Sequence, residues 1–139
     1  MIKKFNGVNI AVKNLEEAAK KYSAIFGSEP KHLGEKDFGF PGLTGVQFIV
    51  EGIRVNLVAS LTPDSAIARF LQSRGEGVFL LSVEVTDVEQ LMKDLTQEGV
   101  KFTTEKPLVF SNVVKVAFGH PSSMHGVQWE FLQWTKPTD

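Results

Sequence analysis

Two segments of the chain carry apolar side chains at the spacing of one helix face. The first runs over residues 14–27 and the second over residues 87–98, and in each the apolar positions recur three and four residues apart. Both begin with a cap signal and end at a glycine, as amphipathic helices commonly do. The cap pairs are Asn14 with Glu17 and Thr86 with Glu89, and the terminal glycines are Gly27 and Gly99.

Runs before and after each predicted helix alternate apolar residues with polar or small ones. A period of two is typical of a strand that packs against the core on one face only. The strongest runs lie at about 7–12, 46–50, 53–59, 80–85, 113–119 and 127–133, and weaker ones near 31–34 and 101–104. The order of elements therefore predicts an α+β fold in which each helix follows one strand and precedes three others.

The two halves of the chain repeat each other. Val12–Glu16 corresponds to Val85–Glu89 at an offset of 73 residues, and Asn56 corresponds to Glu130 at one residue more. The repeat predicts two tandem β-α-β-β-β modules in a single domain over residues 1–139. Module one covers about 5–60 and module two about 78–134, and a connector over 61–77 holds a short helix that Pro63, Asp64 or Ser65 begins and Gly75 ends.

Each strong strand has one apolar and one polar face, because successive side chains point to opposite sides. The apolar positions are expected to pack under the two helices. The other face is polar, with Asn9, Arg54, Asn56, Ser82, Gln128 and Glu130. Such a face is either simply exposed to solvent, as antiparallel sheets allow, or it encloses a polar pocket. The internal repeat favours the pocket, since equivalent positions of duplicated halves tend to lie near a shared centre.

Composition narrows the range of functions. The 139 residues include 15 Lys and Arg and 16 Asp and Glu, which gives a formal net charge of −1. Proteins that bind nucleic acids usually have a basic surface, so we expect no nucleic-acid partner. The absence of cysteine excludes disulfides and thiol chemistry. Without a long apolar run or a signal-peptide core, we expect no membrane association and a cytoplasmic location.

Three segments resemble the methylmalonyl-CoA epimerases of the vicinal oxygen chelate superfamily, which includes glyoxalases, bleomycin-resistance proteins and extradiol dioxygenases. The segments are the connector over 63–77, the first strand and helix start over 7–17, and residues 118–130 from Phe118-Gly119-His120-Pro121 to Glu130. The resemblance implies a glyoxalase-like fold with curved mixed sheets around a central cleft. It also implies a homodimer and a small-molecule ligand such as a CoA thioester.

The resemblance further implies four positions for metal ligands, namely Gly7, Asn56, Leu80 and Glu130. Glu130 alone keeps the residue found in the family, Asn56 offers an amide oxygen, and the other two have no donor side chain. A divalent metal needs about three good ligands, so we expect no metal cofactor. A rebuilt site that uses His125 with Glu130 is the alternative.

Glu130 is the predicted catalytic base for removing a proton next to a thioester carbonyl. The predicted substrate contacts are Asn9, Arg54, Asn56, Ser82 and Gln128, with Ser65 and Arg74 placed toward coenzyme A by the resemblance. Simpler roles compete with these. In these alternatives, Glu130 is a structural carboxylate that pairs with Arg54 or accepts a hydrogen bond from Asn56. Ser65 then only caps the connector helix, and Arg74 is a solvated cation.

Two hypotheses for function follow. In the first, the chain is an isomerase or lyase that acts on an acyl-CoA or a similar small molecule without the family's metal. In the second, it is a non-catalytic, metal-free protein that binds or sequesters a ligand, as the bleomycin-resistance branch does. A scaffold that serves only as a subunit of a larger assembly is a third possibility.

Overall fold

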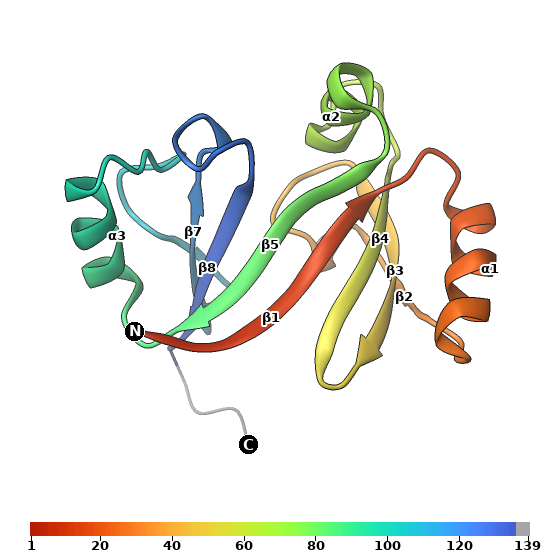
Figure 1. The fold of residues 1–139 in the computed structure, drawn as a ribbon, viewed down its shortest axis with the longest axis horizontal. Helices are drawn as coiled ribbons and strands as arrows, with labels where there is room; N and C mark the ends of the chain where they lie inside the picture. Colours follow the sequence, from red (N-terminus) through yellow and green to blue (C-terminus); the bar gives the residue numbers. More distant parts are fainter. Residues whose placement is uncertain (136–139) are drawn as a thin grey trace. The chain divides into compact units, whose positions relative to one another are not determined.

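The structure is a computed structural model, and it describes residues 1–135. It has eight strands and three α-helices in the predicted α+β arrangement (Figure 1). The chain forms two compact units: the first unit is Gly7–Phe79, and the second unit combines Met1–Asn6 with the chain from Leu80 onward. Strands β1 (Ile2–Ala11) and β5 (Gly77–Val85) each contribute residues to both units.

In the first unit the strands lie in the order β2-β3-β4-β1. The elements are β2 (Lys31–Leu33), β3 (Leu43–Val50), β4 (Ile53–Ser60), α1 (Leu15–Phe26) and α2 (Ala66–Arg74). β1 runs parallel to β4, and the other neighbours are antiparallel. Helix α1 packs on β3 and β4, which confirms the predicted packing of the apolar strand face under the helix.

In the second unit the order is β5-β8-β7-β6, again with one parallel pair, β5 with β8. The elements are α3 (Val88–Gln97), β6 (Leu108–Phe110), β7 (Val114–Gly119) and β8 (Gln128–Trp134). Helix α3 packs on β7 and β8. Among residues 1–135, no helix is long and apolar enough to cross a membrane.

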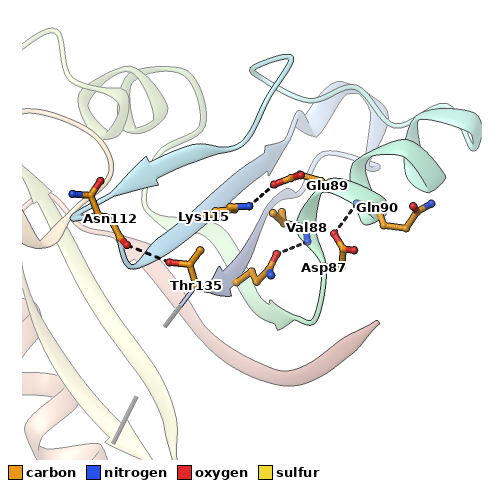
Figure 2. A network of polar contacts seen from close by, with 8 residues as sticks. Asp87, Val88, Glu89, Gln90, Asn112, Lys115 and Thr135 are labelled. Atoms are coloured by element: carbon orange, nitrogen blue, oxygen red, sulfur yellow. Dashed lines mark hydrogen bonds and ion pairs between the residues drawn. The ribbon is translucent and has the colours of Figure 1, made fainter. Parts of the chain in front are cut away.

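The helix ends follow the predicted signals with one correction. The Asn14 side chain accepts from the backbone N–H of Glu17 at 3.0 Å, and Gly27 takes the left-handed conformation with φ 64°. At α3 the cap is Asp87, which accepts from the Gln90 N–H at 3.0 Å, and not Thr86 as predicted (Figure 2). The backbone N–H of Thr86 instead donates to the Met1 carbonyl, at the start of β1.

Each unit has its own core. In the first unit Val12, Phe48 and Leu57 are buried beneath α1, as the strand pattern predicts. In the second unit a larger group is buried between α3 and the strands; it comprises Val83, Val85, Val88, Leu91, Met92, Ala117 and Phe131. Phe48 is the largest side chain of the first core and is 1 % exposed.

The weak strand predicted near 101–104 is wrong. In this segment only Phe102 forms a bridge, to Gly119, and the edge strand is β6, at Leu108–Phe110. The backbone before the bridge is held elsewhere, because the N–H of Lys101 donates to Ser123 Oγ at 2.8 Å. Just after it, Thr104 Oγ1 donates to the Lys106 carbonyl in a turn. The corresponding strand of the first unit, β2, lies where it was predicted.

Candidate functional site

The polar strand positions form two hydrogen-bonded clusters, one in each unit. The carboxyl cluster of the second unit consists of Asn6, Ser82 and Glu130. The amide cluster of the first unit consists of Asn9, Gln47 and Asn56. Both are built on a parallel strand pair, because Ser82 lies opposite Glu130 and Asn9 lies opposite Asn56.

The carboxyl cluster is a directed chain of donors that ends on Glu130. Asn6 Nδ2 donates to Ser82 Oγ at 3.0 Å, and Ser82 Oγ donates to Glu130 Oε1 at 2.5 Å. Ser82 is only 4 % exposed, while Glu130 is half-buried. The side chain of Phe131 packs in the core under α3, so Glu130, its neighbour in the strand, points to the opposite face. The carboxyl group is therefore oriented by the protein and lies away from the helix layer.

The environment of Glu130 increases the basicity of its carboxylate. Burial raises the pKa of the Glu130 carboxyl above its usual value, and the hydrogen bond from Ser82 opposes that rise. A carboxylate whose pKa is raised is a stronger base than one in water. One oxygen accepts from Ser82, which leaves the other oxygen for a proton.

The amide cluster carries no charge. Gln47 Nε2 donates to Asn56 Oδ1 at 3.0 Å, and Asn56 Nδ2 donates to Asn9 Oδ1 at 2.8 Å. Asn56 is therefore at the centre, with its oxygen and its nitrogen both engaged. Such a chain of amides presents hydrogen-bond donors and acceptors of fixed direction, suited to a neutral polar group or an anion rather than to a strongly held cation.

Two of the other predicted site residues lie on the strands that carry the clusters, and two lie at the ends of α2. Arg54 lies opposite Gly7 in the β1–β4 pair, and Gln128 lies opposite Leu80 in the β5–β8 pair. Ser65 caps α2 by accepting from the Ala68 N–H at 3.0 Å and is 5 % exposed, so the capping role is confirmed.

Arg74, at the end of α2, places its guanidinium 5.9 Å from the centre of the Phe70 ring. Sequence reasoning missed Asn6 and Gln47. The register of β3 against β4, which places Gln47 opposite Asn56, is the signal that identifies the second of them.

The family follows from sequence comparison. A sequence profile described as "Glyoxalase/Bleomycin resistance protein/Dioxygenase superfamily" matches residues 7–118, most of the chain. The chain belongs to this superfamily. The match confirms the resemblance stated above. It also agrees with the two β-α-β-β-β units seen in the structure of this chain.

Relatives within the superfamily are named as epimerases. The mitochondrial methylmalonyl-CoA epimerase of Dictyostelium discoideum is 32 % identical, over 91 % of this chain and 75 % of the relative. The ethylmalonyl-CoA/methylmalonyl-CoA epimerase of Cereibacter sphaeroides is 28 % identical, over 96 % and 99 %. The crystal structure of the methylmalonyl-CoA epimerase from Mycobacterium tuberculosis has a TM-score of 0.79 and 26 % identity, covering 99 % of this chain and 90 % of that one.

The metal positions implied by the superfamily do not fit a metal in this chain. A Cβ placed on Gly7 meets the Arg54 carbonyl oxygen at 2.3 Å, so a ligating side chain has no room there without a backbone shift. Leu80 is hydrocarbon and 1 % exposed. Asn56 is already engaged in two hydrogen bonds. Glu130 is the single strong donor among the four positions, fewer than a divalent metal needs.

The histidines add little to this set. His120 Nδ1 accepts from the Ser122 N–H at 3.1 Å, in a turn after β7. His125 has a positive φ of 58° in the turn before β8, and His32 lies in β2. In the part of the chain that the structure describes, no three His, Asp or Glu side chains are grouped as a metal site requires. A two-residue site of His125 and Glu130 stays a prediction.

Proposed function

We propose that this chain is an epimerase-like isomerase that exchanges the acidic α-proton of an acyl-CoA, with Glu130 as the base. The observation that carries the proposal is the carboxyl cluster, in which Ser82 orients a half-buried carboxyl whose pKa is raised. The epimerases named above supply the substrate class, since their names specify methylmalonyl-CoA and ethylmalonyl-CoA.

The reaction requires few groups. The Glu130 carboxylate takes the α-proton of the thioester, the C–H bond breaks, and its electron pair delocalises onto the carbonyl oxygen as an enolate. A proton then returns to the α-carbon. Delivery by Glu130 to the same face regenerates the starting epimer, whereas delivery by water to the opposite face gives the other epimer and leaves Glu130 to release its proton to water. Asn9, Arg54, Asn56, Ser82 and Gln128 are the proposed substrate contacts, with Ser65 and Arg74 toward the CoA part. Donors near the enolate oxygen are the largest expected source of rate acceleration.

The proposal includes catalysis without a divalent metal. Its support is the chemistry of the four implied positions, where Gly7 and Leu80 provide no donor and Gly7 has no room for one. The proposed stabilisation of the enolate then rests on hydrogen-bond donors of the chain. A cytoplasmic location and a homodimer are part of the proposal, and both come from the resemblance and the sequence.

The test is deuterium incorporation at the α-carbon of methylmalonyl-CoA, ethylmalonyl-CoA and propionyl-CoA in heavy water, followed by mass spectrometry. The protein is treated with a chelator and compared with a sample given Co²⁺. We expect exchange in both samples and a loss of roughly 100-fold or more in Glu130→Gln, a typical contribution of a general base. Exchange only with Co²⁺ would overturn the metal-free part, and exchange unchanged in Glu130→Gln would overturn the role of Glu130.

The binding-protein hypothesis is less well supported, because the relatives described above are named as enzymes. The same experiment separates the two. A thioester that raises the melting temperature, remains unexchanged and is retained in native mass spectra would favour a binding protein. The native spectra also report whether the chain is a dimer and whether it holds a metal.

A further inference from the structure

A groove lies in the second unit, between α3 and the segment that follows it. Its volume is about 1250 Å³, and residues of α3, of the segment 100–107 and of β6 and β7 line it. Ligand pockets of drug-sized molecules commonly have about 300–1,000 Å³, so the groove is large enough for an extended small molecule. None of the residues that line this groove takes part in the proposed reaction.

The groove lies on the opposite sheet face from Glu130. Lys115 on β7 lines it and lies opposite Gln133 on β8, whose side chain accepts from the Val88 N–H at the start of α3. Figure 2 shows that the Lys115 side chain extends to Glu89 of α3, on the face of the sheet that α3 covers. Since Glu130 is three residues before Gln133 in the strand, its side chain projects from the other face. Occupation of the groove therefore does not require contact with Glu130.

The floor of the groove is apolar. Met92, Val100, Phe102, Pro107 and Val109 line it, and Val109 is 56 % exposed on the edge strand β6. Exposed apolar surface of this kind gains about 25 cal/mol for each Å² that a ligand covers. The groove is thus able to hold a hydrocarbon chain.

The rim of the groove is basic. Four lysines line it against two glutamates, a local charge of +2 on a chain whose net charge is −1. Lys115 is paired with Glu89 at 2.5 Å, whereas Lys93, Lys101 and Lys106 are exposed. Within residues 1–135, these three ammonium groups form no ion pair with the chain itself. An apolar floor with unpaired cations at its edge is complementary to an anion that carries an alkyl chain.

We propose that this groove binds a single-chain amphiphile with an anionic head group, either a carboxylate or a phosphate. The alkyl chain covers the apolar floor, and the head group lies among the lysines at the rim. The site is independent of the proposed reaction, because the groove and Glu130 lie on opposite faces of the sheet.

The test titrates a dansyl-labelled undecanoate into the full chain at low salt and follows its fluorescence. Dodecanoate, dodecyl phosphate, dodecanol and dodecyltrimethylammonium then compete with the probe. We expect both anions to displace it about tenfold better than the alcohol or the cation, since two solvent-exposed charge contacts together contribute up to about that factor at low salt. Comparison of the two anions identifies the preferred head group. Equal displacement by dodecanol would overturn the proposal.

Two charge-reversal variants make the test specific. Lys93→Glu with Lys101→Glu is expected to weaken probe binding about tenfold at low salt and less at high salt, because ions screen exposed charges. The matched control is Lys20→Glu with Lys31→Glu, which changes the same charge on exposed positions of the first unit. Equal binding by the two variants, or no binding to the parent, would overturn the proposal.

Glu130→Gln is expected to retain full binding of the probe, and loss of binding in that variant would assign the probe to the other face. Amide chemical shifts give an independent localisation. On addition of dodecanoate the shifts should concentrate in α3 and residues 100–107, and shifts concentrated in Ser82 and Glu130 would overturn the proposal.

Discussion

Ser82 donates a 2.5 Å hydrogen bond to Glu130 from the directly opposite position of the parallel β5–β8 pair. The first unit repeats this relationship with Asn9 and Asn56, which are opposite in the β1–β4 pair and are joined at 2.8 Å. Equivalent positions of the two repeats therefore hold a neutral amide pair in one unit and a hydroxyl–carboxyl pair in the other. Of the two, the hydroxyl–carboxyl pair alone contains a group able to accept a proton at neutral pH.

Removing the Ser82 hydroxyl should change the protonation of Glu130. Because the hydrogen bond from Ser82 lowers the pKa of Glu130, Ser82→Ala is expected to raise that pKa further. A lost hydrogen bond to a charged group amounts to about 1.5 kcal/mol, so the rising limb of the pH profile of exchange should move to higher pH. The measurement is the pH profile of deuterium exchange, with Ser73→Ala on the exposed end of α2 as control. A profile that does not move would show that Ser82 acts only in packing.

Asn56 is the central member of the amide cluster, and its replacement should destabilise the first unit. Asn56→Leu leaves Gln47 Nε2 and Asn9 Oδ1 without their partners, at a cost of about 1–3 kcal/mol. Urea unfolding measures this change. Asn56→Asp keeps an oxygen acceptor for Gln47 and should lose less. A loss equal in both variants would mean that the amide hydrogen bonds do not determine the stability of this region.

Gly7 lies where β1 and β4 approach each other, and a side chain at this position should be costly. The Cβ of Gly7→Ala meets the Arg54 carbonyl oxygen at 2.3 Å, so the strands must separate. We expect a loss of about 1–3 kcal/mol for Ala and at least as much for His. Gly34→Ala is the control, since the nearest heavy atom to its Cβ is 3.9 Å away. An unaffected Gly7→His that also gains Co²⁺ binding would contradict both this prediction and the proposed metal-free site.

The repeat pattern predicted most of the fold because each helix and each strong strand has a clear hydrophobic period. The cap at Asn14 followed from local rules alone. The strand predicted near residue 102 is wrong, since this segment forms only a single bridge, between Phe102 and Gly119, and the Lys101 N–H donates to the side chain of Ser123, far along the chain. Asn6 was overlooked for a similar reason: its partner, Ser82, is 76 residues away, and no local pattern marks the pair.

The assignment of Asp87, and not Thr86, as the cap of α3 can be tested directly. Asp87 accepts from the Gln90 N–H, so Asp87→Ala is expected to lower the free energy of unfolding by about 1 kcal/mol. Thr86→Ala should lower it less, because the Thr86 hydroxyl has only a 3.3 Å contact with the Met1 carbonyl and the backbone bond to Met1 remains. Thermal unfolding of the two variants compares them. The reverse order would restore Thr86 as the cap.

Glu130 should make the stability of the chain depend on pH in a defined direction. Its folded-state pKa is raised by burial, so the folded protein holds the Glu130 proton to higher pH than the unfolded chain does. Between the unfolded value, about 4.3, and the raised folded value, the folded state binds more protons, and the free energy of unfolding falls as pH rises. Above the folded pKa the full penalty of a buried charge is present, and below the unfolded pKa it is absent.

Glu130→Gln is therefore expected to be more stable than the parent at neutral pH and to lose the part of the pH dependence that lies in this window. The amide oxygen of Gln still accepts from Ser82, so the variant removes the charge and keeps the hydrogen bond. Urea unfolding across pH 4–8 is the measurement, with Glu29→Gln at an exposed position as the matched control. A variant that gains stability while losing proton exchange would identify Glu130 as a residue kept for chemistry at the expense of stability. A variant that loses stability at neutral pH would instead mark Glu130 as a structural carboxylate.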